Sequence, residues 1–254
     1  MTFDWEKTSR STFFDENEDQ PRHWARPALL LAVACFVFAN FLFMHWYDYL
    51  PKSRLAMLWL GMVPLHAAAL GGALWSLHNH RPAGRRAAAL DLSAAGWRRM
   101  WRNWPRKLSL VGAIYGGALA VSLLTGAVLH SLGYETPPME LLEILHAEPS
   151  PALVVSVVLA AVVVAPVSEE ILFRVVLFDA LRGVGIMFAA FVSSLVFALA
   201  HGSPMHAPAL FFLGLVLQGI RLRAGLWPCM VCHSLFNAGT FVILGLWLGL
   251  AGRG

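Results

Sequence analysis

The stretch that decides the fold is Ala165-Pro166-Val167-Ser168-Glu169-Glu170-Ile171-Leu172-Phe173-Arg174, in which two adjacent carboxylates and one guanidinium lie inside a long apolar run. A carboxylate near the middle of a membrane-spanning helix costs about 2.5–3.5 kcal/mol, so charges at that depth usually face the protein interior and mark function. On a helix Glu170 and Arg174 lie one turn apart with the acid N-terminal to the base, so they can neutralise each other. Glu169 points about 100° away around the helix axis. We therefore expect one acid to be paired and the other to be available.

The composition is that of a membrane protein. Of the 254 residues, 58% are hydrophobic and 13% are charged, and the mean hydropathy is +0.62. Several apolar runs approach the roughly 20 residues that a helix needs to cross about 30 Å of hydrocarbon. Helices also satisfy their own backbone polar groups in lipid. We expect an all-α, polytopic transmembrane helical bundle of about seven spans, with eight as the alternative, plus one interfacial amphipathic helix.

The chain divides into three parts. Residues 1–27 mix acidic and basic side chains without a signal-peptide cleavage pattern, and we expect a cytoplasmic N-terminal tail. Residues 28–130 should form N-terminal transmembrane helices, and residues 151–250 should form a catalytic helical core. The expected spans are 28–47, 55–77, 108–130, 151–182, 186–201, 207–221 and 226–250.

A basic segment, residues 78–107, indicates the topology. It contains several arginines and one lysine but only one acidic residue, Asp91. An excess of positive charge beside a span stays in the cytoplasm. The N-terminus should then be cytoplasmic too. An apolar stripe recurs at helical spacing through Leu90, Ala94, Trp97, Trp101 and Trp104. The stripe favours an amphipathic helix on an anionic inner leaflet, and a solvated basic loop is the alternative.

Four polar residues, Glu169 among them, are expected at one depth in the membrane. Counted at about 1.5 Å per residue from the inner turns, Glu169 and His201 lie about 20 Å and 23 Å along their helices. His233 and Asn237 are four residues apart and share a helix face at a similar height. Three helices could therefore bring these four side chains into one cluster.

The residue types of this cluster suit amide hydrolysis. A carboxylate with an imidazole can take a proton from water and return it to a leaving group. A second imidazole and an amide can donate hydrogen bonds to an oxygen that gains negative charge, and dry surroundings strengthen that stabilisation. The pattern therefore favours cleavage of a peptide bond within the membrane.

Three motifs carry a family resemblance. Glu169-Glu170-x-x-x-Arg174, Phe197-Ala198-Leu199-Ala200-His201 and His233-Ser234-Leu235-Phe236-Asn237 resemble, in order, the motifs of the CPBP family of CAAX-protease and bacteriocin-processing intramembrane endopeptidases. The resemblance covers roughly residues 151–250. It implies that Glu169 and His201 activate water, that His233 and Asn237 stabilise the oxyanion, and that Glu170 and Arg174 support the site. It also implies a multi-pass protein of the bacterial inner membrane.

The expected partners are a membrane-embedded or lipid-anchored protein or peptide substrate and a bilayer with an anionic inner leaflet, and no nucleic acid. No cofactor is expected, because the recognised zinc spacings such as His-Glu-x-x-His are missing, although two His and two Glu leave zinc as the alternative. Cys229-x-x-Cys232-His233 matches a haem-attachment pattern, but it opens a predicted span and is discounted. The alternative function is a catalytically silent membrane scaffold or bacteriocin-immunity protein.

Overall fold

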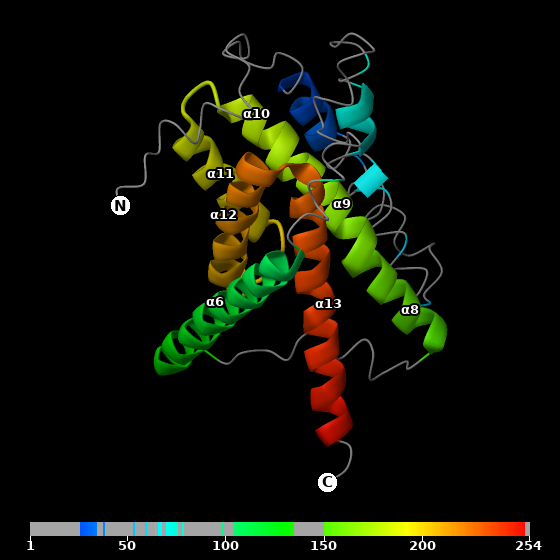
Figure 1. Ribbon diagram of the computed structural model, residues 1–254, viewed down its shortest axis with the longest axis vertical. Coiled ribbons are helices and arrows are strands. Elements are labelled where there is room, and N and C mark those ends of the chain that lie inside the picture. Colours follow the sequence, from blue (N-terminus) through cyan, green and yellow to red (C-terminus); the bar gives the residue numbers. More distant parts are fainter. Residues whose placement is uncertain are drawn as a thin grey trace.

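A computed structural model describes residues 26–34, 38, 53, 59, 64, 66–67, 70–75, 78, 98, 104–134 and 150–251 (Figure 1). This part of the chain is mostly helical and contains no strand, so the prediction of an all-α fold is confirmed for it. The expected tail, most of the first two spans and most of the basic segment lie outside the described residues. The interfacial helix therefore stays a prediction.

The helices from residue 104 onward agree with the predicted spans to within a few residues. The helix α6 spans Trp104–Ser131. One long helix, Pro151–Leu181, consists of α8 (Pro151–Leu159), η3 (Ala160–Val164), α9 (Ala165–Glu169), η4 (Glu170–Leu177) and α10 (Phe178–Leu181). It is followed by α11 (Ile186–Leu199), α12 (Ala207–Ala224) and α13 (Leu226–Ala251).

Four segments are long and apolar enough to cross a membrane: Ser109–Ser131, Pro151–Leu181, Ala207–Ala224 and Leu226–Ile243. The apolar helix α11 is shorter than these. Large apolar side chains, among them Leu124 and Met187, are exposed on the outside of the bundle, as suits a surface that faces lipid. The chain is therefore a multi-pass membrane protein, and the total of seven spans stays a prediction.

The long helix switches twice from α-helical to π-helical hydrogen bonding and back. It starts at Pro151, whose missing N–H does no harm at a helix start, and the hydroxyl of Ser150 accepts the N–H of Leu153 at 3.1 Å. The segments η3 and η4 are π-helical, with the five-residue helix α9 between them. π-helical turns inside α-helices are frequent at functional sites. Glu169 is the last residue of α9 and Glu170 is the first residue of η4.

The segment η4 lies at the centre of the packing. Its Val175 and Val176 are fully buried against Leu226 and Met230 of α13 and against Ala73 of the N-terminal half. Figure 1 shows the helical residues 26–34 (blue) and 70–75 (cyan) beside the upper part of the long helix. The core therefore joins segments from both halves of the chain around the charged stretch.

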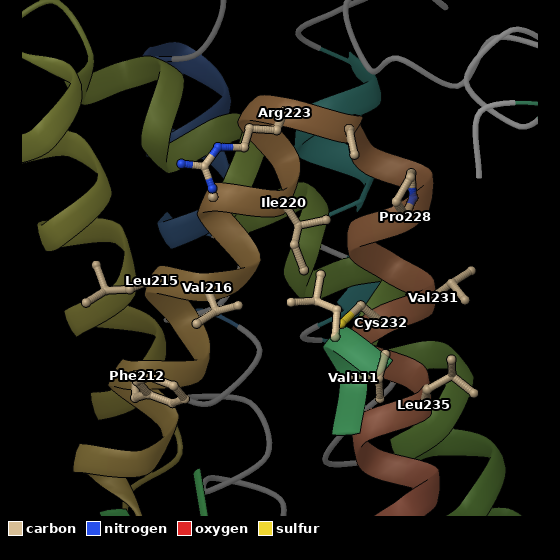
Figure 2. Close-up of a pocket in the computed structure, with 13 residues that line it drawn as sticks. Val111, Phe212, Leu215, Val216, Ile220, Arg223, Pro228, Val231, Cys232 and Leu235 are labelled. Atoms are coloured by element: carbon tan, nitrogen blue, oxygen red, sulfur yellow. The ribbon is translucent and has the colours of Figure 1, made fainter. Parts of the chain in front are cut away.

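An apolar cavity of about 590 Å³ lies between α6, α12 and α13 (Figure 2). Val111, Val216 and Leu235 are among its lining residues, and Arg223 lies at the end nearest the turn between α12 and α13. Cys232 also lines it, directly before His233 in the sequence. The cavity therefore adjoins the helix that carries the third motif.

Candidate active site

Glu170 is the best-connected residue of the site. It is fully buried, and its Oε2 accepts a hydrogen bond from Nε of Arg174 at 3.1 Å, which is the ion pair that the i, i+4 spacing predicted. Its Oε1 accepts a hydrogen bond from Nδ1 of His233 at 2.8 Å. The thiol of Cys229 donates to Oε2 at 2.8 Å. One carboxylate of η4 thus holds one side chain of its own helix and two of α13.

Arg174 faces the ring of Phe197. Its Nη1 and Nη2 are buried without a hydrogen-bond partner, and Cζ lies 4.6 Å from the ring centroid. A guanidinium over an aromatic face is attracted by the ring quadrupole. The same ring makes edge contacts with His201 and His233, at centroid distances of 4.8 Å and 5.8 Å. Phe197 therefore joins the second motif to the first and the third.

Glu169 is placed differently from its neighbour. Its Oε2 lies 3.9 Å from Nε2 of His233, which is too far for a direct hydrogen bond. That oxygen is buried without a hydrogen-bond partner, although 18% of the side chain is exposed. A buried polar atom without a partner in a native site calls for an explanation, and a reactant is one. The sequence predicted an available acid at this position.

His201 lies just beyond the helix that was expected to carry it. The helix α11 ends at Leu199, because Gly202 adopts a positive φ of 68° that closes the helix end. Nδ1 of His201 lies 2.8 Å from the carbonyl oxygen of Phe197, which can only accept, so Nδ1 carries the proton. In the neutral ring Nε2 is then a free base on an exposed side chain. Among the described residues, no hydrogen bond joins His201 to Glu169.

Asn237 satisfies a carbonyl that Pro166 leaves without a donor. The N–H of Ala165 bonds to the carbonyl of Ala160, five residues back, and the next donor in this register would be Pro166, which has no N–H. The carbonyl of Ala161 accepts a hydrogen bond from Nδ2 of Asn237 at 2.8 Å instead. Neighbouring helices commonly satisfy backbone groups freed by proline in this way. One N–H of the amide remains for another acceptor.

Residues 151–239 match the family model described as Rce1-like, Type II CAAX prenyl endopeptidase Rce1-like. The matched residues are those in which the three motifs resemble the CPBP family of CAAX proteases. They include all six predicted site residues. No curated protein and no solved structure gives a significant match.

The matched segment thus brings together Glu169, Glu170, Arg174 and His233 directly. His201 reaches this group through the ring of Phe197, and Asn237 lies one turn beyond His233 on α13. Chemically, the arrangement offers an available carboxylate, an accessible imidazole and two potential donors.

Three side chains of this site, those of Cys229, His66 and Ser168, were not predicted from the sequence. Cys229 lies one turn before His233, so the i, i+4 rule could have placed it on the same face. His66 lies in the N-terminal half, and its Nδ1 is hydrogen-bonded to the hydroxyl of Ser168. No motif contains His66, so no local pattern could have found it. The burial of Cys229 also argues against the haem-attachment interpretation.

Proposed function

We propose that the protein is a CAAX-type intramembrane endopeptidase, which hydrolyses a peptide bond of a membrane-embedded or lipid-anchored protein or peptide. The observation that carries the proposal is the contrast between two adjacent acids. Glu170 is fully engaged, whereas Oε2 of Glu169 has no hydrogen-bond partner and faces Nε2 of His233. This contrast lies within the segment that matches a protease family model.

In the proposed reaction Glu169 and His201 activate a water molecule. The carboxylate, or the free Nε2 of His201, takes a proton from water, and the water oxygen forms a bond to the carbonyl carbon. The carbon–nitrogen bond then breaks, and the same proton passes to the departing amine. No metal and no other cofactor takes part.

His233 and Asn237 are the proposed donors to the oxyanion. Because Nδ1 of His233 already donates to Glu170, the ring must carry both protons for Nε2 to donate. Glu169 and Glu170 lie beside this ring, with carboxylate oxygens 3.9 Å from Nε2 and 2.8 Å from Nδ1. Asn237 would use the N–H that Ala161 does not engage. Preorganised donors of this kind contribute about 2.7–4 kcal/mol each when removed from known oxyanion holes.

The surroundings of the site support this substrate class. The helices around it are apolar and expose large hydrophobic side chains, so a substrate reaches them from the lipid phase. The apolar cavity of Figure 2 adjoins α13 and could hold the hydrocarbon part of an anchored substrate. We place the protein in the bacterial inner membrane with a cytoplasmic N-terminus, because the basic segment favours that orientation.

The test compares cells that carry the wild type or Glu169→Gln. We expect membrane-associated precursors to accumulate in the variant, seen as uncleaved termini by mass spectrometry, at equal abundance of the protein. Asp179→Asn is the matched control, because it changes an acid of the same helix that pairs with Arg182 away from the site. Processing should be unchanged in this control.

Unchanged termini in Glu169→Gln, with the physiological function preserved, would contradict the proposal. That result would instead support a catalytically silent scaffold or immunity protein, which needs the polar residues only for packing. Loss of folded protein in Glu169→Gln would likewise assign this side chain to structure.

A further inference from the structure

A buried histidine from the N-terminal half contacts the helix turn that carries Glu169. His66 is 8% exposed and Ser168 is 1% exposed, and Nδ1 of the imidazole is hydrogen-bonded to the serine hydroxyl. Ser168 directly precedes Glu169 in the sequence. His66 is outside the segment that matches the protease family.

The surroundings of the serine decide which group donates. Oγ of Ser168 lies 2.9 Å from the carbonyl oxygen of Val164 and 3.0 Å from that of Ala165. Both carbonyls can only accept, and the hydroxyl has a single proton. When that proton goes to a carbonyl, the serine oxygen accepts from His66, so Nδ1 carries a proton. The imidazole and the backbone thus hold the serine from two sides.

The turn that His66 contacts through Ser168 lies in the irregular part of the long helix. Glu169 ends α9, which has only five residues and lies between the π-helical segments η3 and η4. The rotation of α9 about the helix axis is therefore not fixed by a continuous α-helical ladder. Pro166 removes one further backbone donor from the same turn. A side-chain bond from another helix can supply the missing constraint.

Packing of the neighbouring residues against the long helix supports the position of His66. Ala73, seven residues after His66 in the sequence, packs against Val175 and Val176 of η4 in the buried core. The helical residues 66–67 and 70–75 thus contact the long helix on both sides of Glu169.

We propose that His66 is a positioning residue of the active site, whose hydrogen bond to Ser168 fixes the rotation of α9 and thereby directs the Glu169 carboxylate. The proposal rests on the proposed protease function. It assigns to the N-terminal half a part in catalysis that the three motifs do not show. His66 itself touches no reacting atom in this scheme and acts through Ser168.

The experiment measures the rate of precursor processing per folded full-length protein in cells, for single and double variants. His66→Leu removes the donor at nearly constant volume, and His66→Asn keeps an N–H near the position of Nδ1. We expect a loss of about 10- to 100-fold in His66→Leu, because misplacing a catalytic group by about 1 Å has effects of this size. His66→Asn should restore most of the rate, which a merely space-filling role would not predict.

Ser168→Ala tests the other end of the bond. It should lower the rate as much as His66→Leu, and the double variant should be no slower than either single variant, since both break one link. Ser193→Ala is the matched control, because Ser193 is also buried and its hydroxyl lies near a carbonyl three residues back, that of Ala190. This control should process at the wild-type rate.

Each outcome separates the two proposals. Wild-type rates in His66→Leu and Ser168→Ala, beside an inactive Glu169→Gln, would overturn the positioning role and leave the protease function intact. Additive losses in the double variant, or failure of His66→Asn to restore the rate, would also overturn it. If His66→Leu does not fold, the processing rates of Ser168→Ala and His66→Asn still test the positioning role: the first should be low and the second close to that of the wild type. Normal processing in Glu169→Gln would overturn the protease function itself.

Discussion

Oε1 of Glu170 accepts a hydrogen bond from Nδ1 of His233 at 2.8 Å, across 63 positions of the sequence. The same carboxylate neutralises Arg174, one turn further along its own helix. Glu170 therefore fixes α13 to the long helix and sets which nitrogen of His233 faces Glu169. Two adjacent acids with different partners can serve two roles, one structural and one chemical.

Glu170→Gln should destabilise the protein far more than Glu169→Gln. Removing one partner of a buried ion pair costs about 3–5 kcal/mol, because the other charge stays buried without compensation. Arg174 would lose its counter-charge and keep a neutral amide oxygen and the ring of Phe197 opposite its guanidinium. Size-exclusion chromatography of heated, detergent-solubilised samples measures the folded fraction. Equal unfolding midpoints for the two variants would contradict the division of roles.

Phe197→Leu should weaken both folding and processing. The ring faces Arg174 and supports the edges of two imidazoles, and a desolvated cation–π contact contributes up to about 2 kcal/mol. Phe191→Leu is the comparison on the same helix, because Phe191 is half exposed and packs edge-on against Phe211 away from the site. The two variants are compared by thermal unfolding and by precursor processing. Similar effects in both would show that Phe197 contributes only apolar packing.

The helices and the first ion pair could be predicted because both depend on local spacing. Apolar runs of membrane length fixed the bounds of α6, α12 and α13 to within a few residues. The pairing of Glu170 with Arg174 follows from one helical turn. Both signals need only a few neighbouring residues.

The remaining contacts depend on distant segments and on the backbone register. Neither the pairing of His66 with Ser168 nor that of Glu170 with His233 has a local pattern. The assumption of 100° per residue also fails through η3 and η4, where the helix widens. Hence the carbonyl of Ala161 as the partner of Asn237 could not be foreseen, although Pro166 marked the place.

Gly214→Ala should separate α11 from α12. A Cβ atom at this position would lie 2.9 Å from Cβ and 3.1 Å from Cα of Ser194, so the backbone would have to move. Overpacking of this kind costs about 1–3 kcal/mol. Gly116→Ala on α6 is the control, because nothing lies within 4 Å of its added Cβ and alanine favours helix by about 1 kcal/mol. The expected result is a lower unfolding temperature for Gly214→Ala alone.

Chelation of metal ions should leave processing unchanged. A zinc site built from the two acids and two imidazoles would need ligand atoms that already have partners, since both oxygens of Glu170 and Nδ1 of His233 are hydrogen-bonded. Within the described ranges no group of three or more His, Cys, Asp or Glu side chains is arranged to hold a metal ion. Membranes treated with 1,10-phenanthroline should therefore process precursor at the untreated rate, while a zinc-dependent membrane protease in the same sample loses activity. A loss that added zinc restores would contradict the water activation by Glu169 and His201 alone, and would assign zinc to this site.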